Sequence, residues 1–148
     1  MKHRWAALVM VLALSALMPR VAAAQASSQP PGRVDRKSGF ELGQNYPNPF
    51  NPETRIPFAV GDPPTCSEPS RQYRVSLRIY NLLAQLVAVP VLQGGGEKLE
   101  NLLLSCSQYT AYWDGKYQGT DREVASGIYL YRLEVNGKQI VKKMIVMK

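Results

Sequence analysis

Carboxylates offer the first candidate chemistry in this sequence. Asp114, Asp121 and Glu123 lie close together after a predicted strand, and paired carboxylates can act as general acid and base. The only histidine, His3, lies in a segment that we interpret below as a removable leader, so Ser-His and Cys-His nucleophilic pairs are excluded from the mature chain. Because the carboxylates flank a polar, glycine-containing loop, we interpret them as solvated turn residues and predict a protein that is not an enzyme.

The two cysteines, Cys66 and Cys106, predict a disulfide and no metal site. Two thiols without further ligands do not make a zinc site, and no acidic spacing typical of a calcium loop is present. We therefore predict neither a metal nor a cofactor. In an exported chain, one bridge between Cys66 and Cys106 is favoured, with two free thiols as the alternative.

An exposed aromatic face could bind sugar by stacking. Period-two patterning leaves Tyr112 and Tyr117 exposed as candidates for such a face. The other aromatic residues of this region fall on predicted core faces, which favours a packing role for them: Tyr109, Trp113, Tyr129 and Tyr131.

Net charge argues against nucleic acid as a partner. The chain has 18 basic and 11 acidic side chains, and without Lys2, Arg4 and Arg20 its net charge falls from +7 to +4. No basic stripe with interleaved stacking aromatics is present. The densest cations lie in residues 138–148, where lysines on an edge strand would also oppose aggregation.

The first 24 residues are typical of a signal peptide. Lys2 and Arg4 precede an uncharged run of 14 residues, short of the roughly 20 that a membrane span needs. Small residues then lead to cleavage between Ala24 and Gln25, with a cut after Ala26 as second choice. We expect export and no membrane span after cleavage. An uncleaved anchor is the alternative.

Residues 25–39 are polar and predict a flexible spacer, and residues 40–148 predict one domain. The domain opens with a proline-rich stretch, residues 42–58. We expect it to be a stiff, extended, non-pairing lead-in, neither a helix nor a central hydrogen-bonded strand, held against the domain by Tyr46 and Phe50.

Period-two patterns predict an all-β domain. Asn136-Gly137 indicates a hairpin, while Pro57 and Pro90 favour sheet edges. With no amphipathic helix, the expected fold is an Ig-like antiparallel β-sandwich of about seven strands. The expected strands cover these residues, the fourth of them a short one: 54–60, 73–80, 85–92, 99–104, 109–113, 128–135 and 139–147.

Five blocks in a fixed order resemble a known family. They are YPNPFNPETRIPF, VSLRIYNLLAQLV, YWDG, VASGIYLYRLEVNG and KKMIVMK. Together they resemble the type A C-terminal sorting domain of cargo of the type IX secretion system, which is related to the Ig-like domain of the flagellar hook-capping protein. The resemblance covers residues 40–148. The family motif corresponds here to Tyr46, Pro47, Asn48, Pro49, Phe50, Asn51, Pro52, Trp113, Asp114, Gly115, Ser126 and Gly127.

The resemblance implies a non-catalytic module that directs export across the outer membrane and attachment at the cell surface. Its implied partners are the outer-membrane secretion machinery and a surface sortase, and its implied route runs through the periplasm to the cell surface or the medium. Recognition would rest on the last strand and its basic residues: Lys142, Lys143, Met144, Ile145, Val146, Met147 and Lys148.

The chain departs from the family in three features. The turn after the IYN block has Leu83-Ala84-Gln85 where relatives commonly have a glycine, and the cysteine pair is not part of the family pattern. We also expect no cargo domain, since only the predicted signal peptide and spacer precede the module. Three alternatives therefore stay open: a free-standing Ig-like structural or adhesive envelope domain, a truncated remnant of a longer cargo protein, and a small secreted hydrolase that uses Asp114. We expect a monomer.

Overall fold

Alternation of apolar and polar residues governs the long strands, as expected for sheets with one face in the core. It is clearest in β4 (Gln72–Tyr80) and β9 (Gly127–Val135), whose predicted core faces are confirmed. The buried apolar residues of these two strands are Tyr73, Val75, Leu77, Ile79, Tyr129, Tyr131, Leu133 and Val135.

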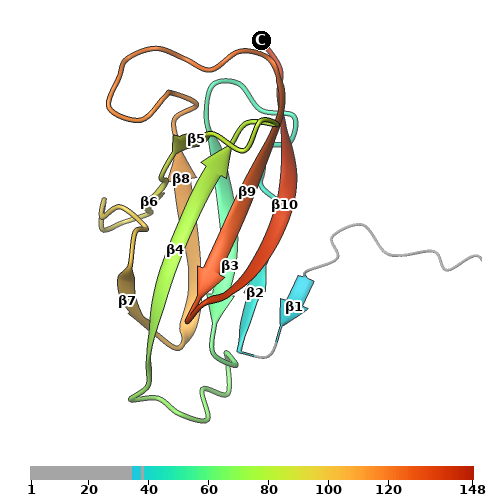
Figure 1. Cartoon of the computed structure of the whole chain (residues 1–148). Helices are drawn as coiled ribbons and strands as arrows, with labels where there is room; N and C mark the ends of the chain where they lie inside the picture. The colour runs from blue at the N-terminus through green and yellow to red at the C-terminus, as the bar shows by residue number, and fades with distance from the viewer. Residues whose placement is uncertain (1–34, 38) are drawn as a thin grey trace, which may run out of the picture.

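The computed structural model describes residues 35–37 and 39–148 (Figure 1). The predicted cleavage site between Ala24 and Gln25 and most of the predicted spacer lie outside these residues. The described residues form strands and connecting loops and contain no helix. The other strands are β1 (Asp35–Lys37), β2 (Phe40–Leu42), β3 (Thr54–Val60), β5 (Leu86–Ala88), β6 (Val91–Leu92), β7 (Leu102–Ser105), β8 (Ser107–Trp113) and β10 (Lys138–Val146).

Two antiparallel sheets pack face to face around one core, which confirms the predicted sandwich. One sheet has the order β1-β2-β3-β8-β6, and the other has the order β10-β9-β4-β5, with β7 also paired to β4. The predicted number of about seven strands is wrong, because ten strands are present in the described residues. The additional strands have two or three residues each, too few to display an alternating pattern.

The sheet begins inside the predicted spacer. β1 pairs with β2 across Gly39, which has a φ of +92°. The prediction of a spacer over the whole of residues 25–39 is therefore wrong for Asp35–Lys37. Strand pairing uses backbone groups, so a polar segment can add to a sheet edge without an apolar pattern of its own.

Pro57 does not mark a sheet edge, contrary to our prediction, because β3 lies between β2 and β8. The backbone nitrogen of Pro57 faces the β2 side of the strand, just beyond the last β2 residue. There the Pro57 carbonyl accepts a hydrogen bond from Gly43 N at 2.8 Å. The Gly43 carbonyl, which an N–H at position 57 would have met, accepts from the Tyr131 hydroxyl at 2.9 Å instead. A side chain thus supplies the missing donor.

The strand predicted over residues 85–92 is two strands in different sheets. β5 pairs with β4, and β6 pairs with β8. The chain crosses between the sheets at Val89 and Pro90, and the Pro90 carbonyl accepts from Leu99 N at 2.9 Å. Pro90 therefore marks the crossing and not a position within an edge strand. The short strand expected near residues 99–104 is β7, which pairs with β4.

Both predicted tight turns place residues at positive φ. The Asn136-Gly137 hairpin is confirmed, with φ values of +49° and +81°. In the β4–β5 turn, Ala84 has a φ of +60°, so it takes the left-handed conformation that a glycine would adopt. At this turn an alanine therefore stands in a glycine-type backbone conformation.

Replacing Ala84 with glycine is expected to raise the free energy of unfolding by about 0.5–1 kcal/mol. An L-residue in this conformation costs about 1–2 kcal/mol, and the greater freedom of glycine in the unfolded chain offsets part of that gain. Urea unfolding would measure the change. The control is Ala125→Gly, at an exposed position without positive φ, which should lower stability. A loss at both positions would contradict the prediction.

Cys66 and Cys106 form a disulfide, as predicted, with their Cα atoms 5.7 Å apart. The bridge ties the β3–β4 loop to the junction of β7 and β8, and no free cysteine is present in the described residues. The two bridged cysteines are 40 positions apart in the sequence. Each lies between a strand of one sheet and a strand of the other.

Removing the bridge by Cys66→Ala with Cys106→Ala is expected to lower the free energy of unfolding by about 3–4 kcal/mol, from loop-closure entropy. Urea unfolding with and without a reductant would measure it. The reductant should bring the wild-type chain to the stability of the double variant and leave the variant unchanged. A wild-type chain insensitive to the reductant would refute the expected contribution.

Candidate functional site at the last strand

The proline-rich segment lies along the end of β10. Phe50 N donates to the Ile145 carbonyl at 3.0 Å, and Met147 N donates to the Phe50 carbonyl at 3.0 Å. Phe50 and Val146 form a parallel bridge. The segment predicted as a non-pairing lead-in therefore makes a short strand-like contact with the outer edge of β10.

Two side chains of the same segment complete this contact. Ile145 N donates to Asn48 Oδ1 at 2.9 Å, and Gln44 Nε2 donates to the Lys143 carbonyl at 3.1 Å. Unpaired backbone groups of an edge strand attract further strands. Here the outward groups at the end of β10 bond to the proline-rich segment, which we call the edge clamp (residues 44–50).

The buried Phe50 ring anchors the clamp to the core. It is 2% exposed and meets the Trp113 ring edge-on, with ring centroids 5.4 Å apart. Trp113 in turn packs edge-on against Tyr129 at 6.1 Å, and its Nε1 donates to the Lys116 carbonyl at 3.0 Å. Aromatic edge-to-face contacts of this kind add to the burial energy.

The YWDG block is shaped by its contact with the same segment. Gly115 has a φ of +74°, and a Cβ there would lie 2.0 Å from the Pro52 carbonyl oxygen. Asp114 Oδ1 accepts from Lys116 N at 3.1 Å, which closes the turn. Glycine is required at position 115 because the backbones of the two segments approach so closely.

Ser126 and Gly127, which we call the SG block, contact the last residues of the chain. Lys148 N donates to Ser126 Oγ at 3.0 Å, and Gly127 pairs with Val146. The Lys148 ammonium lies 2.5 Å from Glu123 Oε2, and this hydrogen bond lowers the pKa of the Glu123 carboxyl. Four of the sequence blocks therefore converge at one end of the sandwich: the lead-in, YWDG, SG and the last strand.

A buried polar network joins the clamp to the opposite sheet. Asn45 Nδ2 donates to Thr54 Oγ1 at 3.0 Å, and Asn45 N donates to the Tyr131 hydroxyl at 3.2 Å. The same hydroxyl donates to Gly43. Sequence reasoning placed Tyr131 only in the core and missed Asn45 and Thr54, since a strand pattern does not reveal which polar side chains are buried.

Replacing Tyr131 with phenylalanine is expected to lower the free energy of unfolding by about 1–3 kcal/mol, because it leaves the buried Gly43 carbonyl without its donor. Urea unfolding would measure the loss. Tyr129→Phe is the control: its hydroxyl donates to the Ala125 carbonyl in a loop, so a smaller loss is expected. Equal losses would argue against a special role for the Tyr131 hydroxyl.

The residues expected to carry recognition divide between core and surface. Met144 and Val146 are buried, and Lys142 is half-buried on the same side of the strand. The exposed members of the stretch are Lys143, Ile145, Met147 and Lys148, of which Lys148 pairs with Glu123.

Tyr46 does not pin the lead-in, contrary to our prediction. Its side chain is 49% exposed, although its backbone forms a bridge with Arg55. The remaining motif residues of this segment, Pro47, Pro49, Asn51 and Pro52, are exposed at the surface of the same loop.

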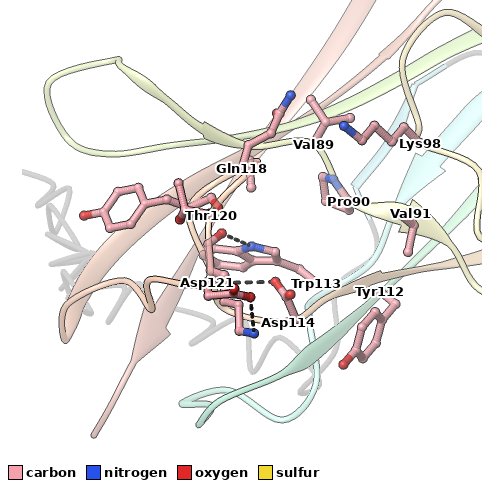
Figure 2. A pocket seen from close by; sticks show the side chains of 14 residues that line it. Val89, Pro90, Val91, Lys98, Tyr112, Trp113, Asp114, Gln118, Thr120 and Asp121 are labelled. Carbon is pink, nitrogen blue, oxygen red and sulfur yellow. Dashed lines mark hydrogen bonds and ion pairs between the residues drawn. The ribbon is translucent and has the colours of Figure 1, made fainter.

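A groove of about 360 Å³ with a mixed polar and apolar lining lies beside the YWDG block (Figure 2). The carboxylates that could serve chemistry there bond to neighbours: Asp114 to Lys116 N, and Asp121 to Lys116 Nζ at 3.5 Å. No group of three or more His, Cys, Asp or Glu side chains that could hold a metal occurs in the described part of the chain.

The two candidate sugar-stacking tyrosines are half-buried. The Tyr112 hydroxyl donates to Glu53 at 2.6 Å, and this bond raises the pKa of Tyr112. The Arg122 guanidinium covers the Tyr117 ring at 4.7 Å. Arg122 therefore covers one face of the Tyr117 ring, and Glu53 holds the Tyr112 hydroxyl.

Comparison with known proteins identifies no relative. The chain matches no protein-family model, no curated protein and no solved structure. Within residues 35–37 and 39–148, no helix is long and apolar enough to cross a membrane.

Proposed function

We propose that the chain is a non-catalytic sorting module, exported across the outer membrane by the type IX secretion system and attached at the cell surface. The observation that carries the proposal is the meeting of the lead-in, YWDG and SG blocks and the last strand at one end of the sandwich: Phe50 and Ser126 bond to the end of the chain, and Gly115 of the YWDG block packs against Pro52 of the lead-in. Blocks that serve one recognition event are expected to meet in space. These are the same blocks on which the sequence resemblance rests.

In this proposal the outer-membrane machinery reads the exposed side of the last strand. Lys143, Ile145 and Met147 point outward, while Met144 and Val146 hold the strand in the core. The backbone of this stretch is hydrogen-bonded to the edge clamp. The machinery would therefore contact the exposed side chains and not pair with the backbone.

Fusing residues 40–148 to the end of an exported reporter, in a host with a type IX system, would test the proposal. We expect the reporter to reach the cell surface. A reporter that stays in the periplasm with its folded module intact would refute it.

Removing Met144–Lys148 would be a poor second test, because it takes two side chains out of the core. A sharper variant combines Lys143→Gln, Ile145→Ser and Met147→Ser, all at exposed positions. Val141→Ser, also exposed on β10, is the matched control. We expect the triple variant to fold and to lose surface delivery while the control keeps it. Normal delivery of the folded triple variant would instead favour a free-standing structural or adhesive envelope domain.

A further inference from the structure

Exposed aliphatic side chains gather at one end of the outer face of the β10-β9-β4-β5 sheet, at the top of Figure 1. Directly opposite residues in an antiparallel pair share a face. Leu130 of β9 lies opposite Tyr80 of β4, and Tyr80 lies opposite Leu86 of β5. Ile128 lies opposite Ile145 of β10. The apolar half-face consists of the half-buried Leu130 and five exposed residues: Leu82, Leu83, Leu86, Ile128 and Ile145.

Hydrogen bonds within the β4–β5 turn support a backbone that leaves both of its leucines exposed. Asn81 Oδ1 accepts from both Leu83 N and Gln85 N at 3.0 Å. Leu82 and Leu83 are 66% and 79% exposed. Polar residues are the usual occupants of such turns, so a fixed pair of aliphatic tips needs a partner that compensates for their exposure.

The charged side chains at the edge of the half-face are cations. The Arg132 guanidinium lies over the Tyr80 ring at 4.7 Å, and Arg132 Nε is buried without a hydrogen-bond partner. Lys143 is exposed beside Leu130, its neighbour across the strands. Neither cation pairs with an acid among the described residues. The acidic side chains farther along this face pair with Arg78: Glu100 and Glu134.

We propose that the apolar half-face docks on an anionic lipid bilayer. Leu82 and Leu83 would enter the boundary between headgroups and acyl chains, and Arg132 and Lys143 would meet lipid phosphates. A protein partner fits less well, because the most exposed residues of the half-face are Leu82 and Leu83, and leucine is under-represented among binding hot spots. The inference does not depend on the export proposal.

Co-sedimentation with vesicles would test this, using the chain from Gln25 onward, which retains every residue of the core cluster. We expect binding to phosphatidylcholine vesicles that contain phosphatidylglycerol, and much weaker binding to phosphatidylcholine alone. Leu82→Ser with Leu83→Ser should reduce the partition constant at least about tenfold. Lys143→Gln should reduce it about fivefold.

Leu103→Ser is the matched control. Leu103 is a leucine with 52% exposure on the same sheet, opposite Arg74 and so about 20 Å along β4 from Tyr80. It should leave binding unchanged. Absence of binding to anionic vesicles, or equal losses in the control and the double-serine variant, would overturn the proposal.

A fluorescent variant gives an independent readout. Leu83→Trp places an indole at the turn tip, while Trp113 in the core is shielded from lipid. Anionic vesicles should shift its emission to the blue, and brominated lipid should quench it. An emission spectrum unchanged by vesicles would also overturn the proposal.

Discussion

Replacing Phe50 with alanine is expected to lower the free energy of unfolding by about 3–5 kcal/mol, the cost of removing a large buried ring. The ring is almost fully buried and packs against Trp113, and its backbone pairs with the last strand. Few other changes in the clamp remove as much buried surface. Urea unfolding, followed by circular dichroism, would measure the loss.

Tyr46→Ala is the matched control, because it removes an exposed aromatic side chain from the same segment. It should change stability by no more than about 0.5 kcal/mol. Amide exchange adds a local readout: Met147 N, which donates to Phe50, should exchange faster in Phe50→Ala under native conditions. Equal effects of the two variants would show that Phe50 does not anchor the clamp.

Replacing Gly115 with alanine is expected to lower the free energy of unfolding by about 1.5–4 kcal/mol. The left-handed conformation has a net cost of about 0.5–1 kcal/mol after the unfolded-state offset, and forced displacement of packed atoms costs about 1–3 kcal/mol more. The displaced atom here is the Pro52 carbonyl oxygen, which belongs to the backbone and cannot rotate away. Urea unfolding would again provide the measurement.

Gly119→Ala separates the two contributions. Gly119 lies in the same loop region with a φ of +72°, close to the +74° of Gly115, but no atom lies within 4 Å of its added Cβ. Only the net conformational cost of about 0.5–1 kcal/mol should remain, since the lower freedom of alanine in the unfolded chain offsets part of the left-handed penalty. If both variants lost the same stability, the close approach of Gly115 and Pro52 would contribute nothing.

These two sites show how far sequence reasoning reaches at the candidate site. The aromatic character of Phe50 among prolines indicated a docked segment, and this is correct. Tyr46 has the same character and is exposed, since a loop without a repeating pattern does not reveal which of its side chains points inward. The sequence places Gly115 in the YWDG block, but its contact with Pro52 joins segments more than 60 positions apart and leaves no local signal.

The amino-acid sequence by itself determined the faces of the long strands, the Asn136-Gly137 hairpin, the all-β class and the Cys66–Cys106 pair. These features depend on local periodicity, on turn residues and on the number of cysteines. The tertiary structure alone decided that Pro57 could lie inside a sheet. Pro57 has no N–H to donate to the Gly43 carbonyl, and the Tyr131 hydroxyl, from the other sheet, donates to that carbonyl instead. It also decided that the proline-rich segment bonds to the end of β10, since pairing of backbone groups between distant segments carries no signature in residue type.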